Sequence, residues 1–158
     1  MAALTSAQVA AIETVDLVSM TTAQIAALGS AQIAAMGTAQ IAALTGAQVA
    51  AIETADLPAL TTAQLVAIDT ADIAGMSTAQ IAALSTAQIS KLSTAQVGAL
   101  TSAQVAAIET VDLVSMTTAQ IAAFSATQIS KLTAGQVAAL TTAQVAAIET
   151  VDVAALTT

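Results

Sequence analysis

One eight-residue stretch decides the fold of this chain: Thr21-Thr22-Ala23-Gln24-Ile25-Ala26-Ala27-Leu28. Variants of this octad follow one another without insertion or deletion, so that residues 5–156 form 19 octads. Residues 1–4 and 157–158 continue the same register as partial octads. We therefore expect residues 1–158 to form a single repeat array, in which each unit buries its apolar residues against its neighbours.

The positions of the octad, lettered a to h from Thr21 to Leu28, differ sharply in composition. Position a is Ser or Thr in 12 octads, and position d is Gln in 14 octads and Asp in five. Positions e and h are always apolar, whereas c, f and g are mostly Ala. Aliphatic residues this regular are not typical of a disordered chain, and they are sufficient for a linear core.

A continuous helix and a β-strand both fit this pattern poorly. Eight residues exceed two helical turns by roughly 80°, so the apolar stripe would spiral around a long helix. In a strand, positions e and h would point to opposite faces, and Ala and Gln are weak strand formers. The pattern therefore favours a structure that restarts in every octad.

A short helix in every octad explains each position. Thr at a and Gln at d form a capping box, in which the hydroxyl accepts from the N3 amide and Gln reaches back to the N-cap amide. The h residue before the cap and the following e residue form a hydrophobic staple, as expected for Leu28 and Ile33. Helices this short need stacking that buries rows e and h. We therefore predict an all-α solenoid, a superhelix of very short helices with one helix per octad.

This interpretation sets expectations for single residues. On capping alone, Gln88→Ala should cost under about 1 kcal/mol of stability. Ile89→Ala should cost about 2–5 kcal/mol if row e is buried. Pro58, at position f, lacks an amide donor and should mark a local irregularity in its octad.

The composition excludes most functional classes. The chain has no His, Cys, Arg, Asn, Trp or Tyr, and its only cations are Lys91 and Lys131 in a net charge of -8. Most nucleophiles, general bases and soft metal ligands are missing, so we expect no enzyme and no catalytic or cofactor-binding residue. Nucleic acid and anionic membranes would be repelled. Neither a transmembrane segment nor a signal peptide is expected, because long apolar stretches and a basic N-terminal segment are lacking.

Acidic residues occur only as pairs, at positions a and d of five octads. The pairs are Glu13/Asp16, Glu53/Asp56, Asp69/Asp72, Glu109/Asp112 and Glu149/Asp152. In one interpretation they are structural, because the helix dipole favours negative charge at a helix start. In the other they bind Ca²⁺ where acids from adjacent turns meet, since calcium requires six to eight oxygen ligands. Apart from this calcium hypothesis, we expect no cofactor.

Successive acidic octads are 40, 16, 40 and 40 residues apart, which has two explanations. If five octads filled a whole number of superhelical turns, the acidic octads would align along the solenoid. Alternatively, a 40-residue block has been duplicated without any structural reason. The sequence leaves both explanations open.

The octads also resemble a known kind of protein. Thr117-Thr118-Ala119-Gln120-Ile121-Ala122-Ala123 and Leu84-Ser85-Thr86-Ala87-Gln88-Ile89 are similar to octapeptide (TTAQIAAL-type) arrays in very large repetitive bacterial proteins, often labelled haem-utilisation or adhesion exoproteins. The resemblance implies a spacer, stalk or filament-forming segment of a larger adhesin-like protein that is secreted or lies at the cell surface. It implies no haem site, because His, Cys and Tyr ligands are missing.

Two further interpretations concern partners. Both ends keep the octad pattern, so the expected partner is the chain itself, end to end or within a longer array. Position b is Ser or Thr in 16 of 19 octads and should face outward, which could form a Thr/Ser ladder that binds ice or another surface. Gly46, Ala126 and Ala134 interrupt this ladder. A peptide-binding groove on the concave surface is a weaker alternative, because few aromatic or charged residues could anchor a ligand.

Overall fold

The computed structural model describes residues 4–148, in which every octad forms one short helical segment and no strand occurs. The segments are α1 (Ser6–Ala10), α2 (Thr14–Val18), α3 (Thr22–Ala26), α4 (Ser30–Ala35), α5 (Thr38–Ala43), α6 (Gly46–Ala50), η1 (Leu57–Ala59), α7 (Thr62–Ala67), α8 (Thr70–Gly75), α9 (Thr78–Ala82), α10 (Thr86–Ile89), α11 (Thr94–Ala99), α12 (Ser102–Ala107), α13 (Thr110–Ser115), α14 (Thr118–Ala122), α15 (Ala126–Ile129), α16 (Ala134–Ala139) and α17 (Thr142–Ala147). The predicted solenoid with one helix per octad is confirmed.

The α-helices that carry Gln at position d begin at the predicted capping boxes. In α3, the Gln24 amide donates to Thr21 Oγ1 at 3.3 Å, and the Thr21 amide donates to Gln24 Oε1 at 2.8 Å. Where position a is glycine, the glutamine half of the box remains, since the Gly29 amide donates to Gln32 Oε1 at 2.9 Å. These bonds satisfy amides that would otherwise have no partner in the first turn of these helices.

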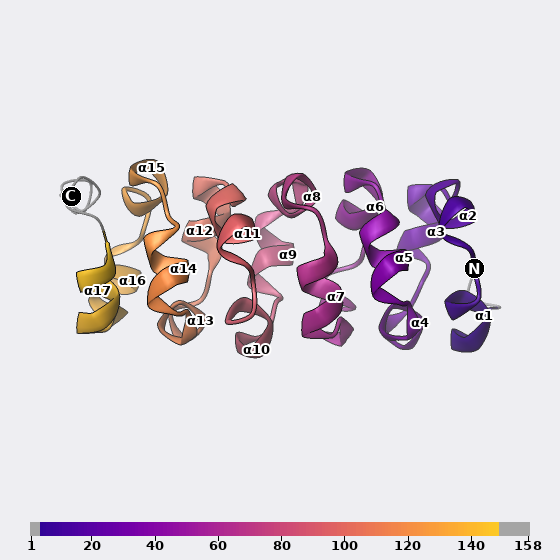
Figure 1. The fold of residues 1–158 in the computed structure, drawn as a ribbon, viewed down its shortest axis with the longest axis horizontal. Coiled ribbons are helices and arrows are strands. Elements are labelled where there is room, and N and C mark those ends of the chain that lie inside the picture. Colours follow the sequence, from indigo (N-terminus) through magenta and orange to yellow (C-terminus); the bar gives the residue numbers. More distant parts are fainter. Residues whose placement is uncertain (1–3, 149–158) are drawn as a thin grey trace.

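Helices three octads apart lie side by side. Thus α1 contacts α4, α2 contacts α5, and the same relation continues to α14 and α17. Figure 1 shows the result, a row of short helices that winds around the long axis of the molecule from α1 to α17. None of these helices, within the described part of the chain, has the length and apolar character needed to cross a membrane.

The two apolar rows form one continuous core from Val9 to Ile129, whereas Val145, at position e of the last described octad, is 41% exposed. Row e is 0–1% exposed from Val9 to Ile129, and row h is 2–4% exposed from Leu28 to Phe124. Leu28 and Ile33, the expected staple pair, both belong to this core. Since a fully buried aliphatic side chain contributes about 1.5–3 kcal/mol, burial between turns compensates for helices that are too short to be stable alone.

One octad departs from the α-helical pattern, as Pro58 predicted. Residues 53–60 contain only the 3₁₀ segment η1, in which the Ala59 amide donates to the Asp56 carbonyl at 3.0 Å. Proline has no N–H, so the α-helical hydrogen bond from this position cannot form. Leu57 and Leu60 nevertheless remain buried, and the core continues through the irregular octad.

The acidic octads do not align at their 40-residue spacing. A helix packs on the helix three octads away, and glutamine side chains reach the octad four positions earlier, so one turn holds between three and four octads. Five octads are therefore more than one turn and less than two, and the alignment hypothesis is wrong. Figure 1 instead places α2 and α8, seven octads apart, along one edge of the solenoid, with α13 along the opposite edge.

Candidate functional site

The glutamine at position d has two roles, one of which the sequence analysis missed. Gln96 Oε1 accepts from the Ser93 amide at 3.0 Å, which is the capping bond. Gln96 Nε2 donates to the carbonyls of Leu65 at 3.0 Å and Ile68 at 2.9 Å, in the octad four positions earlier. One side-chain amide thus caps its own helix and fastens it to the preceding turn.

We call this second contact the glutamine strap. It is formed by Gln32, Gln40, Gln48, Gln64, Gln80, Gln88, Gln96, Gln104, Gln120, Gln128, Gln136 and Gln144. The nitrogen lies between 2.6 Å (Gln128 to Leu100) and 2.9 Å (Gln96 to Ile68) from the h carbonyl. Each strap donates to an h carbonyl, which would cost about 1–3 kcal/mol if it were buried without a donor, and also to the e carbonyl of the same octad in most straps.

The absence of Glu at position d is a feature of the sequence that reflects the strap. A capping box accepts Glu as readily as Gln, and the helix dipole favours Glu near a helix start. Position d is nevertheless never Glu, although Glu occurs at position a in four octads. The strap explains this choice, because a carboxylate cannot donate to the carbonyls of the preceding turn.

The acidic residues at d make a different contact. Asp56 and Asp112 are buried, and each accepts from a hydroxyl 26 residues earlier, Ser30 Oγ and Thr86 Oγ1 respectively. These hydroxyls are at position b, three octads earlier. Asp at d therefore contacts the turn through octad n-3, whereas Gln at d contacts it through octad n-4.

Asp72 lies opposite a glycine instead of a hydroxyl. A Cβ atom added to Gly46 would be 2.7 Å from Asp72 Oδ1, so the glycine leaves room for the carboxylate. Burial, and secondarily the negative charge of Asp69, raises the pKa of Asp72 above its ordinary value. Both causes disfavour the ionised form.

Within residues 4–148, the acidic residues at position a are exposed and form no capping box. Glu13 and Glu109 precede α2 and α13 without a side-chain capping bond, whereas Asp69 accepts from the Ala71 amide at 2.9 Å. Glu53 and, in the first acidic octad, Asp16 are also exposed. Glu149 and Asp152 lie outside the described residues.

The candidate calcium ligands do not assemble across turns in residues 4–148. No three Asp, Glu, His or Cys side chains lie close enough there to hold a metal ion together. Since calcium requires six to eight oxygens, a pair within one octad is a small fraction of a site. The calcium hypothesis stays a prediction, for which a titration is given below.

The hydroxyl row at position b does not follow one face from octad to octad. Its residues are mostly exposed, for example Thr22, Thr38 and Thr118. Because spatial neighbours are three or four octads apart, hydroxyls of consecutive octads lie on different sides of the solenoid. A hydroxyl ladder could therefore use only every third or fourth octad.

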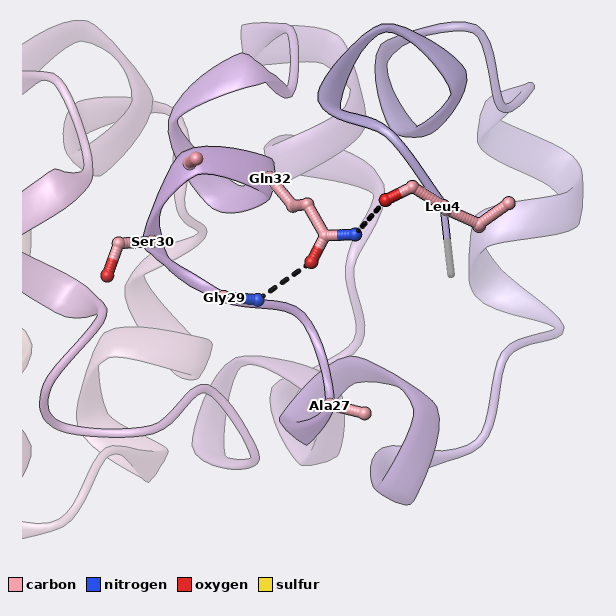
Figure 2. A pocket seen from close by; sticks show the side chains of 6 residues that line it. Leu4, Ala27, Gly29, Ser30 and Gln32 are labelled. Atoms are coloured by element: carbon pink, nitrogen blue, oxygen red, sulfur yellow. Dashed lines mark hydrogen bonds between the residues drawn. The ribbon is translucent and has the colours of Figure 1, made fainter. Parts of the chain in front are cut away.

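Neither of two hollows on the surface of the described residues assembles catalytic groups. The first, about 440 Å³, is lined by Leu4, Ala27 and residues 29–32. Figure 2 shows its edge, where Gln32 bridges the Gly29 amide and the Leu4 carbonyl. Residues 1–3, which precede Leu4 in that octad, lie outside the described residues, so the hollow is no evidence of a ligand site.

The second hollow, about 350 Å³, has an alanine floor and a single charged residue. It is lined by Ser102, Ala103, Ala106 and Lys131. A lone lysine without an adjacent base or acid provides no pair for proton transfer. The site with the most specific chemistry in the described chain is therefore the strap, and that chemistry is structural.

The comparisons with known proteins agree with this description. The family described as the ALTTAQ repeat matches at residues 9–46, 49–86, 81–107 and 105–142. The chain matches no curated protein and no solved structure. The family matches coincide with the tandem octads that form the solenoid.

Proposed function

Since the chain belongs to the ALTTAQ repeat family, we propose that it is a structural repeat segment, a spacer whose length is set by the number of its octads. One observation carries this proposal. The same strap and the same buried rows join octads that carry Gln at position d to the preceding turn, as Gln96 and Gln104 illustrate. Adding octads therefore adds length by contacts identical to those already present.

The proposal extends to the parent protein and to partners. The resemblance of the octads to arrays in large bacterial exoproteins supports a stalk within an adhesin-like surface or secreted protein. Repeated contacts between identical turns support association with further octads of the same kind, in a longer array or end to end. The absence of His, Cys and Tyr, and of any described pair of groups suited to proton transfer, supports a role without catalysis.

Arrays of different length test the spacer role. Chains with about one half, one and two times the present number of octads would be measured by negative-stain electron microscopy and small-angle X-ray scattering. We expect rods of constant diameter whose length rises in proportion to octad number. Compact particles whose radius of gyration follows the size dependence of globular domains would contradict the proposal.

Ice binding is the alternative function, and exposed position b hydroxyls such as Thr22 and Thr38 are the observation in its favour. The winding of these hydroxyls around the solenoid weakens it, because a flat ice surface requires several hydroxyls on one face. Thermal hysteresis at high protein concentration decides between the two functions. We expect none, and a clear hysteresis gap would favour the alternative.

A further inference from the structure

The acidic octads interrupt the row of glutamine straps. Asp56, Asp72 and Asp112 occupy position d, where Gln would donate to the octad four positions earlier. An ionised carboxylate has no hydrogen to donate. The turn contacts at these octads therefore lack the hydrogen bonds that strap every neighbouring octad to the preceding turn.

The carbonyls left without a strap can be named. By the register of the other straps, Asp56 stands opposite the carbonyls of Ile25 and Leu28, and Asp112 opposite those of Ile81 and Leu84. Each e carbonyl still accepts from the h amide of its own octad, as Ile81 does from Leu84 at 3.2 Å. The h carbonyl, elsewhere the closest strap acceptor, receives no glutamine amide.

Two further features loosen these octads. Glu109 and Glu13 make no side-chain capping bond, so the helices that follow them also lack the capping box. The octad of Asp56 contains only the 3₁₀ segment η1. The carboxylate contact to octad n-3, Thr86 to Asp112, is one hydrogen bond in place of the two or three of a strap.

We propose that the acidic octads are release joints, the places where one turn of the solenoid separates from the next before the strapped turns do. The buried rows e and h continue through every joint, so that a joint opens and recloses without unfolding the array. In the described array the straps are missing at octads 53–60, 69–76 and 109–116, and strapped octads lie on both sides of each. The release joints add to the proposed spacer function defined places at which the rod opens first. Only their biological meaning rests on that function.

Hydrogen–deuterium exchange of the full chain, read by mass spectrometry, tests the joints. The informative octad is 77–84, because it has its own capping box and its own strap but faces Asp112 on the other side. Its matched reference is octad 93–100, which has both features and is strapped by Gln128. We expect amides of α9 to exchange about tenfold faster than those of α11, which corresponds to about 1.4 kcal/mol.

Two variants separate the strap from the helix cap. Asp112→Gln supplies the missing donor, and we expect exchange in 77–84 to slow about tenfold, to the level of 93–100. Glu109→Thr supplies only a capping hydroxyl, and we expect no change in 77–84. The reciprocal variant Gln128→Asp should accelerate exchange in 93–100 by a similar factor.

Two results would overturn the release joints. One is equal exchange in 77–84 and 93–100 of the unmodified chain. The other is unchanged exchange in 77–84 after Asp112→Gln in a variant whose circular dichroism is that of the parent chain. Either result would leave the spacer function in place, because the length of the rod would still rise with octad number. If the length did not rise with octad number, the spacer function would fail, and the exchange pattern would be unaffected.

Discussion

At the scale of single residues, the glutamine at position d is the residue on which the fold depends most. Its oxygen caps one helix and its nitrogen fastens that helix to the preceding turn, so one side chain satisfies backbone groups of two octads. Thr or Ser at position a contributes only to the cap. Glutamine is suited to this position because an amide is both acceptor and donor.

The first prediction concerns Gln88, which is 2% exposed and donates to the carbonyls of Leu57 and Leu60. Gln88→Ala leaves these carbonyls and the Ser85 amide without a side-chain partner, and we expect a loss of about 2–4 kcal/mol. Gln24→Ala is the matched control, because Gln24 is exposed and its capping oxygen is its described contact. It should cost under about 1 kcal/mol in urea denaturation. Equal costs would mean that the strap contributes nothing.

The second prediction concerns the charge of Asp72. Its pKa in the folded chain is raised by burial and by Asp69, so the ionised form destabilises the fold at neutral pH. As the pH falls through the raised pKa to the ordinary value, Asp72 becomes protonated and this penalty disappears. Asp72→Asn should therefore raise the melting temperature at pH 7 and lose that advantage near pH 3. An advantage that is independent of pH would contradict this explanation.

At the scale of the element, the octad is a helix that begins correctly but is too short to persist alone. The capping box fixes the start, and burial of one e and one h side chain against other turns supplies the stability. The substitutions that matter most at this scale change the backbone or remove a buried side chain.

The third prediction concerns the irregular octad. Pro58→Ala restores an amide donor at position f, and we expect η1 to become an α-helix like its neighbours. The free energy of unfolding should rise by about 1 kcal/mol, less than the full helix-interior cost of proline because the present backbone already avoids the clash. Thermal melts followed by circular dichroism at 222 nm measure both effects. A loss of stability would show that the 3₁₀ geometry is required there.

The fourth prediction compares a buried and an exposed aliphatic residue. Ile89 is fully buried in row e, so Ile89→Ala should cost about 2–5 kcal/mol through lost burial and a residual cavity. Val111, at position c, is 59% exposed, and Val111→Ala should change stability by less than about 0.5 kcal/mol. Chemical denaturation of both variants tests the assignment. Similar effects would mean that row e is not the core.

At the scale of the whole molecule, the net charge is strongly negative, because the chain has ten acidic residues and two lysines. Exposed like charges repel one another, and salt screens this repulsion over about 8–10 Å near physiological ionic strength. The fifth prediction is therefore a higher melting temperature in sodium chloride. Calcium chloride at the same ionic strength should act alike, because each acidic pair supplies too few oxygens. A further rise with calcium alone would support the calcium hypothesis.

Much of the fold was predictable because it is local. The capping box of Thr21 and Gln24, the buried positions of Leu28 and Ile33 and the break at Pro58 all follow from residues close together in the sequence. The strap was not predictable by such reasoning, because Gln96 and its acceptors are 28 and 31 residues apart. The same holds for the contact of Asp112 with Thr86.

The sequence by itself determined the repeating helix, its cap and its two buried rows, because these depend on residue types within one octad. Only the tertiary structure decided that a turn holds between three and four octads, and hence which octads face one another. That number depends on how helix n packs on helix n-3 while its glutamine reaches octad n-4. The packing between turns therefore decides which octad each acidic residue and each glutamine contacts.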